Sequence, residues 1–443
     1  MCPVWALLDQ RVDVALMVQA RQWGRPAQAG TSGRRKFLSA SGRAFIGAAS
    51  LAVTTSRAIA QPAEAAGANA LTAIDPNAIR RRGVGFRGYD PGRVSPGFTL
   101  FTPQFGDGTV YLIGIEGDVV HTWKLPYPPG RYGYLTDRGT LFYNGRTPGP
   151  GWLGRQGFKG GVAPEADWNS NMLWEVHHAD HRQDGRLLRN GNVLLLCAGV
   201  VPPDVAERVQ GGIPGTEDDG NMYADYAVEM TPDGQTVWEW RSWEHLDPQA
   251  DGHTAPGDVR NDWTGGNAVI EAPNGDILVS MRQNSTVVRI DRQTSDVIWK
   301  LGAPPLSGQH APAPLSNGNL LLLDNGPFRP DQSVVGGTPF PFSRVIELDP
   351  NTSSIVWEFR EAVPQYFFSP EQGNAQRLPN GNTLINEGFF GRIFEVTSEG
   401  DVVWEYQNPY FGADTAPANA QQAQVFRAYR YTAEEIALAQ QIV

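Results

Sequence analysis

The sequence predicts an all-β protein with the architecture of a six-bladed β-propeller. Four segments share one pattern, in which Asn-Gly lies just before a short apolar stretch. Asn-Gly between apolar runs favours a tight hairpin, because both residues tolerate positive φ. A second run ending in tryptophan follows each of them, and a repeat of roughly 45–60 residues is typical of propeller blades. The four segments are 189–196, 273–280, 316–323 and 379–386, and the tryptophans are Trp238, Trp299, Trp357 and Trp404.

Two more blades are predicted before these four. Segment 109–123 resembles the outer half of a blade and ends at Trp123, while 135–144 and 172–176 together resemble another blade. Segment 425–431 is strand-like but has no partner next to it in the sequence. We expect it to return to the first blade, because this closure removes exposed sheet edges.

The first 60 residues have the features of a twin-arginine export signal. Arg34 and Arg35 precede a mildly apolar stretch at 44–53, and Ala58-Ile59-Ala60 is a small-x-small cleavage site. The apolar stretch is too short for a permanent transmembrane helix. We therefore predict a signal at 1–60, an Ala/Pro/Gly-rich linker at 61–96 and a propeller at 97–443, with a periplasmic or secreted location.

The charge of the predicted mature chain limits its partners. Residues 1–60 contain eight Lys/Arg and two Asp/Glu, so 28 basic and 45 acidic residues remain, a net charge of −17. Such a charge argues against binding to nucleic acid or to anionic membranes. We expect a small molecule as the partner and no insertion into a membrane.

The innermost strand of each blade lines the axis, so polar residues on these strands are the candidate site. Alignment on the Asn-Gly turns places Asn267, His310 and Gly373 at equivalent positions. We take His310 as a candidate catalytic residue, and the alternative is a histidine that holds a neighbouring blade. Asn267 and Asn374 are candidates for substrate binding.

A second histidine cluster precedes the third blade, in segment 175–181. His177 and His178 point to opposite faces if the segment is a strand, so one of the two is expected at the axis as a catalytic residue. His178 and His181, with nearby carboxylates, are alternatively ligands for a divalent metal.

Arg329 follows Asp324-Asn325-Gly326 in the His310 blade. Its guanidinium suits an oxyanion, because it donates paired hydrogen bonds. The alternative is a surface arginine paired with Asp331 or Asp324. Asn325 is the third candidate for substrate binding.

These residues resemble those of the bacterial aryl-sulfate sulfotransferases. The resemblance runs from about 97 to 431 and is most specific at Gln309-His310, Asp324-Asn325-Gly326 and Arg329. It implies a six-bladed propeller that moves a sulfuryl group between phenols through a sulfated histidine, with no cofactor required. The chain departs from the family pattern at Gly265, where the family has a histidine, and it has no histidine in the final blade.

Three functions follow from these observations. The first is sulfuryl transfer between phenolic compounds by His310, His178 or His177, and Arg329. The second is a metal-dependent lyase or hydrolase that uses His177, His178, His181 and His310. The third is a propeller that binds a ligand without chemistry.

Overall fold

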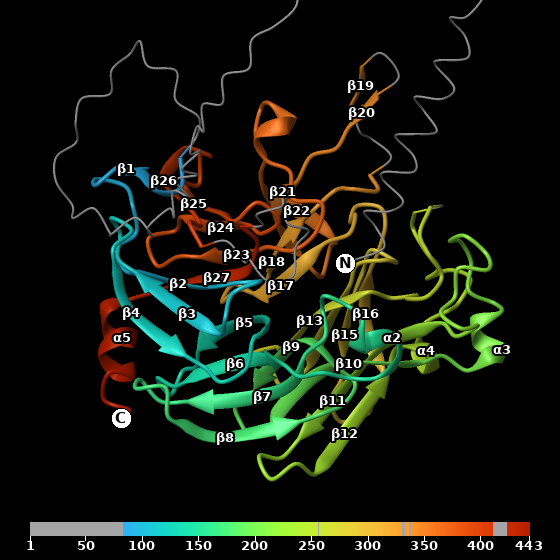
Figure 1. Cartoon of the computed structure of the whole chain (residues 1–443). Coiled ribbons are helices and arrows are strands. Elements are labelled where there is room, and N and C mark those ends of the chain that lie inside the picture. The colour runs from blue at the N-terminus through green and yellow to red at the C-terminus, as the bar shows by residue number, and fades with distance from the viewer. Residues whose placement is uncertain (1–82, 256, 330–332, 336–337, 411–422) are drawn as a thin grey trace, which may run out of the picture. The chain divides into compact units, whose positions relative to one another are not determined.

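The computed structural model describes residues 83–443 except 256, 330–332, 336–337 and 411–422. Within these residues, six antiparallel sheets form the blades of a propeller, as predicted (Figure 1). The innermost strands of neighbouring blades contact one another in order around the axis. The predicted signal at 1–60 and most of the predicted linker lie outside the described residues.

Of the first three blades, blade 1 combines strands from both ends of the chain, whereas blades 2 and 3 are each built from four consecutive strands. Blade 1 consists, from the axis outward, of β27 (Val425–Tyr431), β2 (Phe98–Pro103), β3 (Thr109–Ile113) and β4 (Val119–Lys124). Blade 2 consists of β5 (Pro129–Leu135), β6 (Leu141–Arg146), β7 (Gly161–Ala166) and β8 (Met172–His177). Blade 3 consists of β9 (His181–Leu187), β10 (Val193–Val200), β11 (Tyr223–Met230) and β12 (Thr236–Arg241).

The other three blades follow in chain order, except that blade 6 also includes the N-terminal strand β1. Blade 4 consists of β13 (Gly266–Glu271), β14 (Ile277–Met281), β15 (Thr286–Ile290) and β16 (Val297–Leu301). Blade 5 consists of β17 (His310–Pro314), β18 (Leu320–Asp324), β21 (Arg344–Asp349) and β22 (Ser354–Phe359). Blade 6 consists of β23 (Asn374–Arg377), β24 (Thr383–Glu387), β25 (Arg392–Val396), β26 (Val402–Gln407) and β1 (Gly85–Tyr89).

Short elements connect or flank the blades. They are the two-stranded ribbon of β19 (Ser333–Val335) and β20 (Thr338–Phe340), the helices α2 (Gly151–Gly154), α3 (Pro203–Ala206), α4 (Ser242–His245) and α5 (Ala433–Ala439), and a 3-10 turn at Pro364–Tyr366. In the described part of the chain, no helix has the length and apolar character needed to cross a bilayer.

The two ends of the propeller chain meet in blade 1, which confirms the predicted closure. Strand β27 pairs with β2 in antiparallel register, from Phe98 opposite Tyr431 to Pro103 opposite Val425. The N-terminal strand β1 pairs with β26 and gives blade 6 a fifth strand. This strand lies inside the stretch predicted to be a linker. The sequence pattern did not indicate it, because β1 is short and contains two glycines.

The recurring tryptophans join neighbouring blades, in addition to filling the core. In five blades the indole Nε1–H donates to the next blade, at a turn between its two outer strands. This bond explains why tryptophan recurs near the end of these five blades, since a purely apolar residue has no such donor. The bonds run from Trp123 to Asp167 O (3.1 Å), Trp238 to Ser295 Oγ (3.0 Å), Trp299 to Pro350 O (2.8 Å), Trp357 to Ser398 O (2.9 Å) and Trp404 to Ile115 O (2.6 Å).

Candidate active site

The innermost strands begin side by side at one end of the axis, which we call the leading mouth. Gln183 of β9 donates to Gly266 O of β13 at 2.7 Å, and the Asn267 amide donates to Gln309 O, just before β17, at 2.8 Å. The N–H of Gly373, just before β23, donates to Phe426 O of β27 at 3.1 Å. The leading mouth therefore collects side chains from blades that are far apart in the sequence.

Arg427 crosses the axis and joins four blades. Its guanidinium contacts Asp184 at 3.1 Å, the Tyr132 hydroxyl at 3.0 Å and Asn267 O at 2.9 Å. The hydroxyl of Tyr132 also donates to Asp184. Because both charges are buried and compensated, this cluster holds β5, β9, β13 and β27 together.

His310 begins β17 and is held in one tautomer. The side chain is 3% exposed, and its Nδ1 lies 2.9 Å from Asn325 Oδ1 and 3.1 Å from Gly308 O. Both partners are acceptors, so Nδ1 carries the proton and Nε2 carries the lone pair. Nε2 accepts the backbone N–H of Gln372 at 3.1 Å. Burial, followed by the positive charge of Arg282, lowers the pKa of His310 to about 3, so the ring is neutral.

The backbone around His310 is strained on both sides. Ala311 and Gln372 have φ values of +50° and +67°, in the left-handed region that non-glycine residues rarely adopt. The β17–β18 register also shifts between His310 and Ala313. Strain of this kind is costly and clusters at functional sites.

The three predicted substrate-binding asparagines connect backbone segments at the leading mouth. Asn374 exchanges two hydrogen bonds with Ala428 of β27, at 2.9 and 3.0 Å. Asn325 accepts from His310 and donates to Ser369 O and Gln372 O, at 2.8 and 2.9 Å. Asn267 Nδ2 donates to Gln309 O and so links blade 4 to the segment just before blade 5. These amides thus position the site around His310.

Arg329 is buried beside Asp324 rather than extended over the mouth. Its Nη2 lies 3.0 Å from Asp324 Oδ2, and the same carboxylate binds Arg344 at 2.9 Å. The guanidinium also covers the Phe342 ring at 4.5 Å. Arg329 therefore has the pairing with Asp324 given by the alternative, but it is buried rather than on the surface, and its positive charge is compensated.

The histidine cluster at 175–181 does not form one inner strand, which corrects the prediction. His177 ends the outermost strand β8, is exposed and lies 2.8 Å from Glu175. His178 lies in the turn to β9, and its Nδ1 is 3.5 Å from Cys197 Sγ of β10. The contacts described for His178 lie in blades 2 and 3, whereas the side-chain hydrogen bonds of His310 lie in and just before blades 5 and 6, and its ring packs against Phe426 of blade 1. The structure therefore does not bring the two together.

His181 is also unsuited to the predicted metal site. It is fully buried, its Nδ1 accepts the Gly161 N–H at 3.1 Å, and its Nε2 lies 3.2 Å from Asp184 O. Both nitrogens are therefore occupied by backbone groups. Across the described ranges, no three His, Cys, Asp or Glu side chains are arranged to hold a metal ion.

The backbone disfavours a side chain at Gly265, where the family has a histidine, and at Gly373, which aligns with His310. Gly265 has φ +61°, and a Cβ there would lie 2.6 Å from Gln283 Cγ. Gly373 has φ +101°, and a Cβ would lie 2.3 Å from Asn386 O. The positive φ and the close neighbours therefore favour glycine at both positions.

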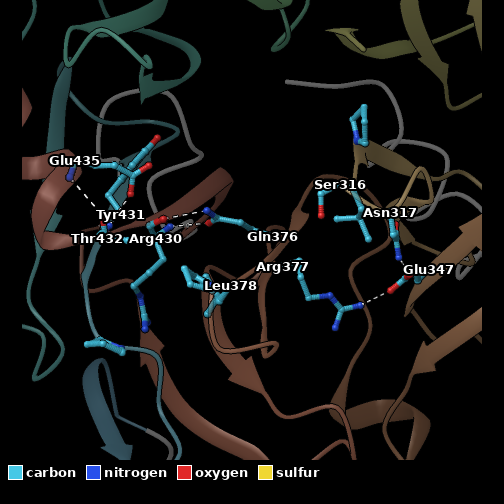
Figure 2. Close-up of a pocket in the computed structure, with 14 residues that line it drawn as sticks. Ser316, Asn317, Glu347, Gln376, Arg377, Leu378, Arg430, Tyr431, Thr432 and Glu435 are labelled. Carbon is cyan, nitrogen blue, oxygen red and sulfur yellow. Dashed lines mark hydrogen bonds and ion pairs between the residues drawn. The ribbon is translucent and has the colours of Figure 1, made fainter. Parts of the chain in front are cut away.

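A cavity of about 720 Å³ lies at the other end of the axis, where β17, β23 and β27 end. Figure 2 shows Gln376 and Tyr431 on one side of it and Asn317 and Glu347 on the other. Arg377 is paired with Glu347 at 2.7 Å. Because none of the predicted site residues lines this cavity, it is separate from the leading mouth.

Sequence reasoning missed Arg427, Tyr132 and Arg282. Arg427 was visible as a charged residue within the apolar run 425–431, which is the expected mark of a buried ion pair. Arg282 follows β14 directly and gave no sequence signal, because it lies outside the segments aligned on Asn-Gly.

Comparison with solved structures finds distant propeller-like matches. A protein of unknown function from Bacteroides caccae is 14% identical, with a TM-score of 0.47, over 76% of this chain and 99% of that chain. A virginiamycin B lyase from Staphylococcus aureus is 12% identical, with a TM-score of 0.40, over 74% and 86%. BamB from Moraxella catarrhalis is 11% identical, with a TM-score of 0.30, over 73% and 76%. These likenesses carry no argument about function.

A search of curated proteins finds no match. The family model described as arylsulfotransferase (ASST) matches residues 177–409, which are 233 of the 443 residues. The matched region starts at the end of β8 and includes His310 and Arg282. With more than half of its length matched, the chain belongs to the arylsulfotransferase family.

Proposed function

We propose that the protein transfers the sulfuryl group of an aryl sulfate at the leading mouth, with His310 Nε2 as the acceptor nitrogen. The observation that carries this proposal is the fixed tautomer of His310. Nδ1 donates to Asn325 and burial keeps the ring neutral, so the lone pair is on Nε2. A neutral imidazole is the nucleophilic form.

The reaction has two steps. In the first, Nε2 attacks sulfur, the sulfur–oxygen bond to the aryl group breaks, and the phenolate takes a proton from water. In the second, the oxygen of an acceptor phenol attacks sulfur, the nitrogen–sulfur bond breaks, and the acceptor's proton passes to water. Attack requires the N–H of Gln372 to leave Nε2, and the strained φ of Gln372 favours such a movement.

Hydrolysis of 4-nitrophenyl sulfate tests the proposal. We expect nitrophenol release without added metal, and a faster release when a second phenol is present, because the acceptor regenerates free His310. Absorbance measures the release, and mass spectrometry measures the sulfated acceptor. Release that never depends on an acceptor, and gives no sulfated product, would contradict sulfuryl transfer.

The second candidate is a propeller that binds an aryl sulfate without chemistry. Two observations favour it, namely the N–H of Gln372 on Nε2 and the absence of side chains at Gly265 and Gly373. Calorimetric binding of 4-nitrophenyl sulfate without release of nitrophenol would identify this function. The metal-dependent alternative has no ligand cluster in the described ranges to support it.

We also propose export through the twin-arginine route. Arg34 and Arg35 are the residues that a translocation receptor reads, so replacing both with lysine should leave an uncleaved precursor in the cytoplasm. Immunoblots of cell fractions measure the precursor and the mature protein. Normal amounts of mature protein outside the cytoplasm in the double variant would show that the signal has been misread.

A further inference from the structure

Arg282 lies at the leading mouth, next to the loop that covers His310. Its backbone N–H donates to Gly265 O at 3.1 Å, and its Nη2 donates to Pro370 O at 3.3 Å. Pro370 is two residues before Gln372, whose N–H binds His310. The charge of Arg282 is also felt by His310, where it disfavours the protonated ring. Arg282 therefore extends from blade 4 toward the reacting nitrogen.

The charge of Arg282 is not compensated by an acid among the described residues, unlike the charges of Arg182, Arg329, Arg344 and Arg427. In the described part of the chain, Arg282 contacts only neutral groups: Gln283 Oε1 at 2.7 Å, Pro370 O and the Phe328 ring at 4.9 Å. For comparison, Arg182 pairs with Asp225 and Asp262, Arg329 and Arg344 pair with Asp324, and Arg427 pairs with Asp184.

Arg282 has one donor that is unpaired among the described residues, and this donor is placed to bind an oxyanion. Its Nε is buried and has no hydrogen-bond partner among the described residues. Nε lies beside Nη2 on the edge of the planar guanidinium, and this edge can donate two parallel hydrogen bonds. The residue as a whole is partly exposed, whereas His310 is buried.

We propose that Arg282 is the anion-binding residue of the leading mouth, and that it receives the sulfate oxygens of an aromatic sulfate ester beside His310. This inference rests on the proposed function and specifies its ligand. Binding at this edge supplies Arg282 with the negatively charged partner that its described contacts lack. The chain has a net charge of −11, so an uncompensated cation in it selects an anionic ligand against the field of the whole protein.

Titration calorimetry with sodium sulfate and with 4-nitrophenyl sulfate tests this assignment. Arg282→Gln keeps the side-chain length and polarity but removes the charge, and we expect it to weaken binding of both anions by about 10–100-fold, the loss of one or two charge-assisted hydrogen bonds. Arg282→Lys should recover part of the affinity, because it restores the charge without the fork. Arg155→Gln, which alters an exposed arginine paired with Asp218, is the matched control and should bind like the wild type.

The outcomes separate this inference from the proposed function. If the anions bind in an Arg282-dependent manner but no nitrophenol is released, the assignment of Arg282 as the anion-binding residue is confirmed and the proposal of sulfuryl transfer is wrong. If nitrophenol is released and Arg282→Gln has unchanged KM and sulfate affinity with an unchanged melting temperature, the assignment of Arg282 is overturned and sulfuryl transfer stands. Wild-type protein that neither binds these anions nor releases nitrophenol would overturn both.

Discussion

A chain truncated after Gln424 should fail to melt cooperatively. The truncation removes β27, the innermost strand of blade 1, and leaves β2 with an unpaired edge facing the axis. It also removes Arg427, and leaving its partner Asp184 buried without a cation costs about 3–5 kcal/mol by itself. That loss is comparable to the whole free energy of unfolding at the low end of its usual range.

Circular dichroism and thermal melting of the purified protein measure this effect. A milder truncation after Thr432 removes α5 but keeps β27, and serves as the control. We expect it to lower the melting temperature, because Ile436 and Ala439 pack against the core of blades 1 and 2, but to leave one cooperative transition. A truncation after Gln424 that still melts cooperatively near the wild-type temperature would contradict closure by β27.

His310→Asn should abolish phenol release while leaving the fold intact. The asparagine amide can replace the Nδ1–H donor to Asn325, but it has no nitrogen lone pair to attack sulfur. Loss of a nucleophile should lower kcat by about 10³-fold or more. The release of nitrophenol from 4-nitrophenyl sulfate measures it, with thermal melting as the check on folding.

His245→Asn is the matched control for this substitution. His245 is in α4, on the outer side of blade 3, where it stacks on Trp240. Its removal should leave the rate unchanged. A folded His310→Asn protein with the wild-type rate would show that the reaction does not pass through His310.

The propeller could be predicted because the sequence patterns that specify its blades are local. Each Asn-Gly turn and each closing tryptophan is encoded within a few residues, and Gly191 and Gly381 adopt the positive φ that such turns require. The same alignment placed His310 at the start of an inner strand, where the structure has it. The linker prediction failed at β1, since a five-residue edge strand with two glycines carries little periodicity.

The site was less predictable, because blade boundaries and charge pairing are not local. A three-residue turn separates β8 from β9, so His177 and His181 look like one strand although they belong to neighbouring blades. The sequence does not show which of Arg329 and Arg282 has an acidic partner in the fold. Only the positions of Asp324 and the neutral groups around Arg282 show that one charge is compensated and the other is not.

The most direct test of the account is a crystal structure of the protein soaked with an aryl sulfate. We predict density for the sulfate group at the leading mouth, with its oxygens within hydrogen-bonding distance of Arg282 and its sulfur facing His310 Nε2, and with the N–H of Gln372 displaced from that nitrogen. Density for the ligand in the 720 Å³ cavity at the other end of the axis, with His310 and Arg282 unchanged, would contradict the account.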